Sequence, residues 1–125
     1  MEKVKKISEF PIQLTDLNDG LDGYFDKKQI VINENMSNGQ KVAALFHELT
    51  HSILHKDAKG DRREKEVQAE SVAYIVCNYY GIETSENSFP YIAEWSGSQD
   101  SESLIKSLDV IQKTAADIIS KIDNM

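Results

Sequence analysis

The chain has 125 residues, a formal net charge of −7 and one cysteine. Its length predicts a single domain over residues 1–125, and the lone cysteine excludes an intrachain disulfide and favours the reducing cytoplasm. The acidic balance argues against nucleic acid as a partner, because phosphate binding needs clustered Lys and Arg. No apolar run approaches the roughly 20 residues of a membrane span, and the N-terminus lacks the apolar region of a signal peptide.

The first third of the chain predicts an arm followed by a hairpin. Residues 1–19 mix charged and apolar positions without a regular period, which predicts a short helix or extended arm interrupted at Pro11. Residues 23–25 and 29–33 are rich in aromatic and β-branched side chains, with a polar loop between them, and so predict a β-hairpin. Because the second strand precedes the next helix directly, we expect it to be an edge strand that can pair with an extended peptide.

A helix is predicted to start at Ser37, because Gln40 follows with the spacing of a capping box. The helix is expected to run to about Lys56. Apolar residues three or four positions apart form its core stripe: Val42, Leu45, Phe46, Leu49 and Ile53. Beside this stripe lies the HExxH sequence of residues 47–51, which carries the most specific chemical signal in the chain.

In the HExxH sequence, His47 and His51 differ by about 40° around a helix axis and about 6 Å along it. Their imidazoles can therefore bind one metal ion from adjacent turns. Glu48 stands where it can reach a water molecule on that ion without being a ligand. The spacing predicts a catalytic Zn²⁺ site with Glu48 as the acid and base; the alternative is a chance HExxH whose histidines are ordinary surface residues.

A catalytic zinc site needs a third protein ligand, which a neighbouring helix should supply. Asp61 predicts the N-cap of a second helix, and Gly81 the residue after its end. Glu66 and Glu70 share the face of this helix that turns apolar further on, and so point inward. We expect Glu66 to be the third ligand and Glu70 to accept a hydrogen bond from His47. The reverse assignment, with Glu70 as the ligand, stays open.

Two more residues are candidates for a place near the site. His55 lies about 12 Å along the helix from His47, too far to share one ion. We expect it at the helix C-terminus, where a positive charge is favoured. Tyr91, in the loop-like segment 85–97, is the candidate oxyanion donor.

Residues 98–125 predict an amphipathic C-terminal helix. Its apolar seam steps by three and four residues: Leu104, Leu108, Ile111, Ala115, Ile118 and Ile122. We expect this seam to pack on the core of the domain itself. A contact with a partner or a second copy of the chain, or a position across the cleft, are the alternatives.

The HExxH sequence at 47–51, followed by Glu-x-x-Ala-Glu-x-x-Ala at 66–73, resembles the ImmA/IrrE family of zinc metallopeptidases. It is also similar to the zincin-like C-terminal domain of ArdC-type antirestriction proteins, as is the segment 88–97. The resemblance covers about residues 20–97 and implies a small α+β, minimal gluzincin domain. In this domain a β-hairpin or short antiparallel sheet packs on the HExxH helix and on a following helix, whose Glu66 completes the site.

The resemblance implies a zinc-dependent metallo-endopeptidase that acts on a protein or peptide. A broad protease would be harmful inside a cell, so we expect a selective intracellular protein substrate. Likeness to ImmA/IrrE proteins implies cleavage of a transcriptional repressor, and likeness to ArdC proteins implies a mobile-element context. The alternative is a catalytically silent, zinc-stabilised domain that binds a partner protein. Mn²⁺ and Fe²⁺ also suit a site of two histidines and one glutamate.

Overall fold

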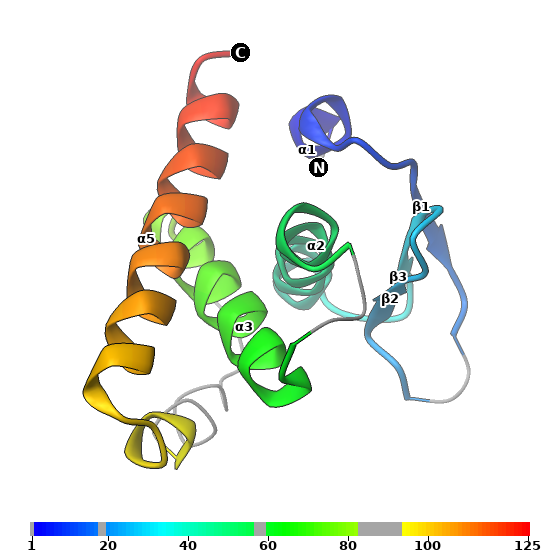
Figure 1. Ribbon diagram of the computed structural model, residues 1–125. Helices are drawn as coiled ribbons and strands as arrows, with labels where there is room; N and C mark the ends of the chain where they lie inside the picture. Colours follow the sequence, from blue (N-terminus) through cyan, green and yellow to red (C-terminus); the bar gives the residue numbers. More distant parts are fainter. Residues whose placement is uncertain (1, 18–19, 57–59, 83–93) are drawn as a thin grey trace.

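The structure is a computed structural model that describes residues 2–17, 20–56, 60–82 and 94–125. The elements in chain order are α1 (Glu2–Ile7), β1 (Ile12–Thr15), β2 (Gly23–Phe25), β3 (Ile30–Asn33), α2 (Asn38–Leu54), α3 (Arg62–Tyr79) and α5 (Ser101–Asp123). In this α+β arrangement the sheet lies on one side of α2, and α3 followed by α5 lies on the other (Figure 1). None of the helices in these ranges has the length and apolar character to cross a membrane.

The sheet is mixed, with strand order β1-β3-β2. β2 pairs antiparallel with β3, with Gly23 opposite Ile32, which confirms the expected hairpin. β1 pairs parallel with β3, with Ile12 opposite Ile30, so the expectations of a purely antiparallel sheet and of an edge position for residues 29–33 are wrong. All four residues of β3 are buried, and a continuous apolar run of this kind is typical of a central strand.

The N-terminus of α2 carries the predicted capping box. The Gln40 backbone N–H donates to the Ser37 hydroxyl at 3.2 Å, and the Gln40 side chain accepts from the Ser37 backbone at 3.3 Å. The core stripe is confirmed at its centre but not at its end, because Ile53 is 42% exposed. Ser52 is the buried residue of that last turn, and its hydroxyl donates to the Leu49 carbonyl.

α3 begins and ends as its terminal residues predict. The Asp61 side chain accepts from the Arg63 backbone N–H at 2.9 Å. At the other end, Gly81 has a φ of +69°, and its N–H donates to the Asn78 carbonyl, while the Ile82 N–H donates to the Cys77 carbonyl. This pair of bonds is the Schellman motif, which requires the left-handed conformation that glycine adopts most easily. The motif fixes where α3 stops.

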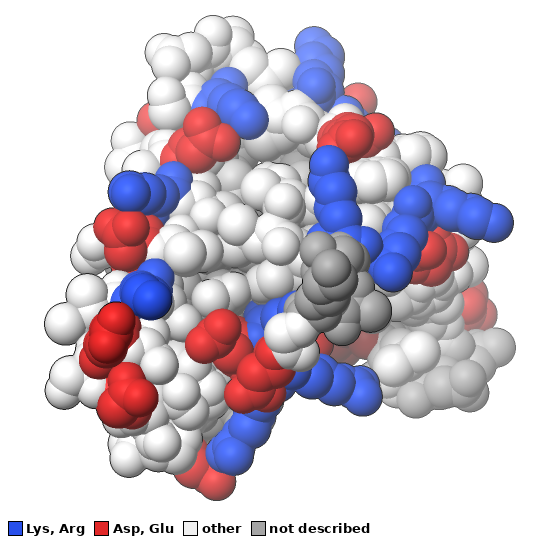
Figure 2. Space-filling model, viewed as in Figure 1, with Lys and Arg blue, Asp and Glu red and all other residues white. Residues whose placement is uncertain are grey.

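α5 runs parallel to α3 and packs along it (Figure 1). The expectation that its seam joins the core of the domain is confirmed for Ile111, Ala115, Ile118 and Ile122. The prediction is wrong for Leu108, which is 48% exposed, and the neighbouring Ser107 is buried instead. Figure 2 shows acidic and basic side chains alternating along the outer face of α5, where three ion pairs join residues four apart: Glu102–Lys106, Asp109–Lys113 and Asp117–Lys121.

Candidate metal centre

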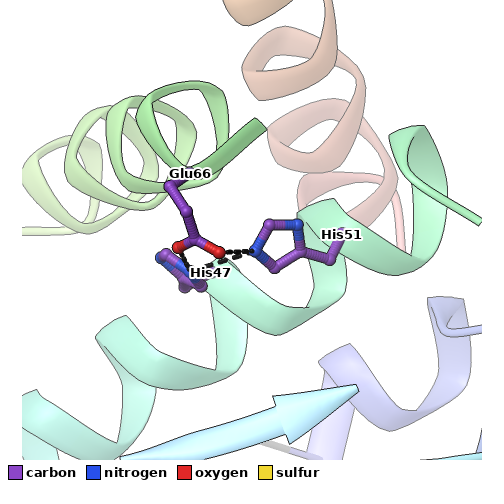
Figure 3. Close-up of side chains that lie close together, drawn as sticks. All are labelled: His47, His51 and Glu66. Atoms are coloured by element: carbon purple, nitrogen blue, oxygen red, sulfur yellow. Dashed lines mark hydrogen bonds and ion pairs between the residues drawn. The ribbon is translucent and has the colours of Figure 1, made fainter. Parts of the chain in front are cut away.

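The packing of α2 against α3 brings His47, His51 and Glu66 together (Figure 3). His47 Nε2 lies 3.1 Å from Glu66 Oε2, and His51 Nε2 lies 3.3 Å from Glu66 Oε1. The two Nε2 atoms lie 3.2 Å apart. The two Nε2 atoms and the two carboxylate oxygens of Glu66 thus face one another across the gap between the two helices.

The donor set fits a zinc ion in both spacing and chemistry. Ligand atoms placed tetrahedrally at roughly 2.0–2.1 Å from zinc are separated from one another by roughly 3.3 Å, close to the distances given above. Two imidazoles and one carboxylate are the ligands of many catalytic zinc sites, and they leave the fourth position for water or substrate. Among the described residues, these three form the group that could hold a metal ion.

The local electrostatics also favour a cation at this point. Burial lowers the pKa of His47, but hydrogen bonds to Glu66 and Glu70 outweigh it and raise this pKa to about 10. Hydrogen bonds to His47 and His51 hold the pKa of Glu66 well below its ordinary value. The surroundings therefore stabilise a positive charge between the helices, which either a proton or a metal ion can supply.

Glu70 contacts the other face of the site. Its Oε1 atom lies 2.6 Å from His47 Nδ1, one helical turn beyond Glu66. With His47 Nε2 turned toward Glu66, the ring proton belongs on Nδ1 and is donated to Glu70. This geometry favours Glu66 over Glu70 as the residue that faces the ion.

Glu48 lies in a cleft of about 490 Å³ beside the two histidines. The cleft is lined by Gly23–Phe25 of β2, by the histidine face of α2 and by the first turns of α3. Burial raises the pKa of Glu48, and the neighbouring His47 and His51 oppose this effect. A carboxylate with a raised pKa is a stronger base and is therefore better suited to accept a proton.

His55 is the C-cap of α2, so its predicted place at the helix end is confirmed. The predicted preference for a positive charge is wrong, because burial lowers the pKa of His55 and outweighs its hydrogen bond to Gln68. His55 Nδ1 lies 2.8 Å from His51 Nδ1, and its Nε2 lies 2.7 Å from Gln68 Oε1. Sequence reasoning missed Gln68, which stands about 200° around α3 from Glu66 and belongs to no apolar or acidic pattern.

Tyr91, the candidate oxyanion donor, lies outside the described residues. Among the described tyrosines, Tyr24 lines the cleft from β2. Tyr79 and Tyr80 lie at the far end of α3, where both hydroxyls contact Asp123. A phenol is therefore present at the cleft, on an element for which the sequence predicted only a strand.

Comparison with known proteins places this site in a family. The model of the Peptidase_M78 family, described as IrrE N-terminal-like domain, matches residues 6–96. An uncharacterized protein of Bacillus anthracis, pXO2-81, is 39% identical over 99 residues, or 76% of this chain. The chain spans only 17% of the length of that relative. No solved structure matches the chain.

Proposed function

The chain belongs to the Peptidase_M78 family of IrrE N-terminal-like domains, and from this premise we propose that it is a zinc-dependent endopeptidase with a protein substrate. One observation carries the proposal. The Nε2 atoms of His47 and His51 and the carboxylate of Glu66 converge at 3.1–3.3 Å beside the half-buried Glu48. These residue types in this arrangement suit hydrolysis of an amide bond by activated water.

In this proposal His47, His51 and Glu66 would hold the zinc ion. When bound, zinc supplies a Lewis acid that polarises a carbonyl and lowers the pKa of a neighbouring water to about 7. Glu70 accepts the Nδ1 proton of His47, so Nε2 is the nitrogen that would face the ion once its own proton is released. The two helices thus provide ligands whose orientation is set before the ion arrives.

Glu48 moves the proton. Its carboxylate takes a proton from the water as the water oxygen attacks the carbonyl carbon of the peptide. It then delivers this proton to the amide nitrogen as the carbon–nitrogen bond breaks, which leaves a carboxylic acid and an amine. Burial raises the pKa of Glu48, which makes its carboxylate a better proton acceptor for the first half of this cycle.

The substrate enters, in this proposal, as an extended peptide along β2. β2 pairs with β3 through one edge, and no other described strand pairs with its second edge. Residues 23–25 of β2 line the same cleft as Glu48. A peptide that adds to this edge would be held by main-chain hydrogen bonds. In this proposal β2 is therefore the edge strand that pairs with the peptide, a role that the sequence alone assigned to residues 29–33.

The cleft also favours a substrate with acidic side chains. Three basic residues line it, Lys27, Arg62 and Lys65, whereas its acidic residues, Glu48 and Glu66, have the roles given above. Lys27 has a φ of 73°, the one positive φ among the described residues other than glycine. A lysine rarely adopts this conformation, and such strain is concentrated at functional sites. We therefore propose acidic residues beside the cleaved bond.

A library of peptides tests the proposal. The zinc-loaded protein is incubated with the library, and new termini are identified by mass spectrometry, with chelator-treated protein in parallel. We expect new termini that form only with zinc and that share one sequence pattern around the cleaved bond. Absence of any zinc-dependent cleavage, with zinc bound in full, would favour the catalytically silent binding domain instead.

A further inference from the structure

A chain of hydrogen bonds leads from His51 away from the metal centre. Figure 3 shows that the second ring nitrogen of His51 points away from Glu66. This Nδ1 atom lies 2.8 Å from His55 Nδ1, and His55 Nε2 lies 2.7 Å from Gln68 Oε1. The Gln68 amide nitrogen then donates to the Ser107 hydroxyl at 3.3 Å. Side chains of α2, α3 and α5 are thereby joined in one line.

Only one placement of protons lets His51 act as a ligand through Nε2. The His51 proton must lie on Nδ1 and be donated to His55 Nδ1, which must carry a lone pair. His55 then carries its proton on Nε2 and donates it to the Gln68 carbonyl oxygen. This bond turns the Gln68 amide group toward Ser107. The direction of every bond follows from the lone pair on His51.

The chain of hydrogen bonds ends in a buried polar contact between Gln68 of α3 and Ser107 of α5. Gln68 is 8% exposed and Ser107 is 3% exposed. Leaving either group without a partner would cost free energy, because water cannot replace the lost hydrogen bond. This contact explains why the serine, and not the neighbouring Leu108, is the residue of that turn that α5 buries. α5 lies beyond residues 6–96, which the family model matches.

We propose that His55, Gln68 and Ser107 are positioning residues that fix the proton and ring orientation of His51 and make α5 a part of the metal centre. His47 and His51 are then oriented differently. A carboxylate on α3 holds His47, whereas a neutral imidazole that depends on α5 holds His51. The inference rests on the metal ligands of the proposed function and does not depend on peptide hydrolysis.

Zinc affinity tests this assignment without any substrate. Zinc is titrated against a chromophoric chelator, with Gln68→Leu, Gln68→Glu and Ser107→Ala compared with the wild-type protein. Loss of an orienting partner typically weakens metal binding 10- to 100-fold. We expect about 10-fold or more for Gln68→Leu and a smaller loss for Ser107→Ala. Gln68→Glu should restore most of the affinity, because its carboxylate still accepts from His55.

Ser52→Ala is the matched control. Ser52 is as buried as Ser107, but its hydroxyl donates to the Leu49 carbonyl, so it stands outside the line. It should leave zinc affinity unchanged even if it lowers stability. Equal affinities for wild type, Ser107→Ala and Gln68→Leu would overturn the proposal. If Gln68→Leu does not fold, the comparison of zinc affinity between Ser107→Ala and Ser52→Ala decides the question.

Two spectroscopic readouts separate orientation from general destabilisation. In ¹⁵N spectra of the zinc-loaded protein, His51 should be metal-bound through Nε2 and protonated on Nδ1. The Co²⁺-substituted Gln68→Leu variant should show an altered visible spectrum relative to wild type. Binding of His51 through Nδ1, or an unchanged cobalt spectrum in a folded variant, would contradict the inference. A protein that passes these tests but cuts no peptide would contradict only the proposed function.

Discussion

Glu70 lies 2.6 Å from Nδ1 of His47, one turn of α3 beyond the Glu66 that faces the opposite nitrogen of the same ring. One helix therefore supplies both a candidate ligand and the group that orients another. The partner helix α2 supplies His47 and His51 with the same four-residue spacing. The geometry of the centre follows from the packing of two helices.

Glu70→Gln should weaken zinc binding by about 10-fold or more, because an amide orients the His47 ring less strongly than a carboxylate. Chelator competition measures the change. Glu64→Gln, the same substitution on the same helix away from the cleft lining, is the control and should have no effect. Equal losses in both variants would point to a general charge effect.

Glu48→Gln should reduce kcat/KM by about 100-fold or more while zinc stays bound at full stoichiometry, because it removes the proton carrier and no ligand. A fluorogenic peptide chosen from the library measures the rate, and metal analysis measures the zinc. Glu34→Gln, at an exposed glutamate, should keep both. Undiminished cleavage by Glu48→Gln would refute the proposed mechanism.

Arg62→Glu should raise KM several-fold for a peptide with acidic flanking residues and leave kcat nearly unchanged, because Arg62 lines the cleft and touches no reacting atom in the proposed mechanism. Arg63→Glu is the paired control. Arg63 belongs to the same first turn but forms an exposed ion pair with Glu94 outside the cleft lining. The KM effect should shrink at high salt; an equal effect in both variants would exclude a specific contact.

Gly23→Ala should lower the free energy of unfolding by about 1–3 kcal/mol, as overpacking does. A Cβ atom at Gly23 would lie 2.7 Å from the Val31 carbonyl oxygen and 2.9 Å from Ile32 Cδ1. Gly97→Ala serves as the comparison, since nothing lies within 4 Å of its Cβ position. Urea denaturation of both variants measures the difference. A neutral Gly23→Ala would mean that β2 does not approach β3 so closely.

The pH dependence of stability should carry a contribution from Cys77. Burial raises the pKa of its thiol from 9.0 to about 11. Between these values the unfolded chain releases a proton that the folded protein keeps, so stability falls as pH rises, by up to about 1.4 kcal/mol per pH unit. Urea denaturation at pH 8.5, 9.5 and 10.5 measures this slope. Cys77→Ala should lose this part of the slope, and identical slopes would contradict the thiol assignment.

Most of the candidate site could be predicted from the sequence, because the residues concerned are spaced along single helices. His47 and His51 need only helical geometry, and the inward face of α3 could be inferred from the apolar residues that follow Glu70. The line through Gln68 and Ser107 could not be predicted. A buried contact between two polar residues on different helices leaves no apolar period in either of them.

The fold was predicted where amphipathic periodicity is strong and missed where it is weak. α2, α3 and α5 each carry apolar residues at spacings of three and four. β1 has four residues, of which the last three are exposed, so it lacks the alternation that marks a half-buried strand. Without β1, the second edge of β3 seemed free. His55 was misjudged for another reason, since burial lowers its pKa in spite of its hydrogen bond to Gln68.

Because the site consists of two pairs with a four-residue spacing, it is sensitive to register and not to the length of chain between the helices. One residue inserted between His47 and His51, or between Glu66 and Glu70, would turn the later member by about 100° and separate the pair. An insertion between α2 and α3 leaves both spacings unchanged. A longer connection between α2 and α3 should therefore leave the four side chains in the same relative positions.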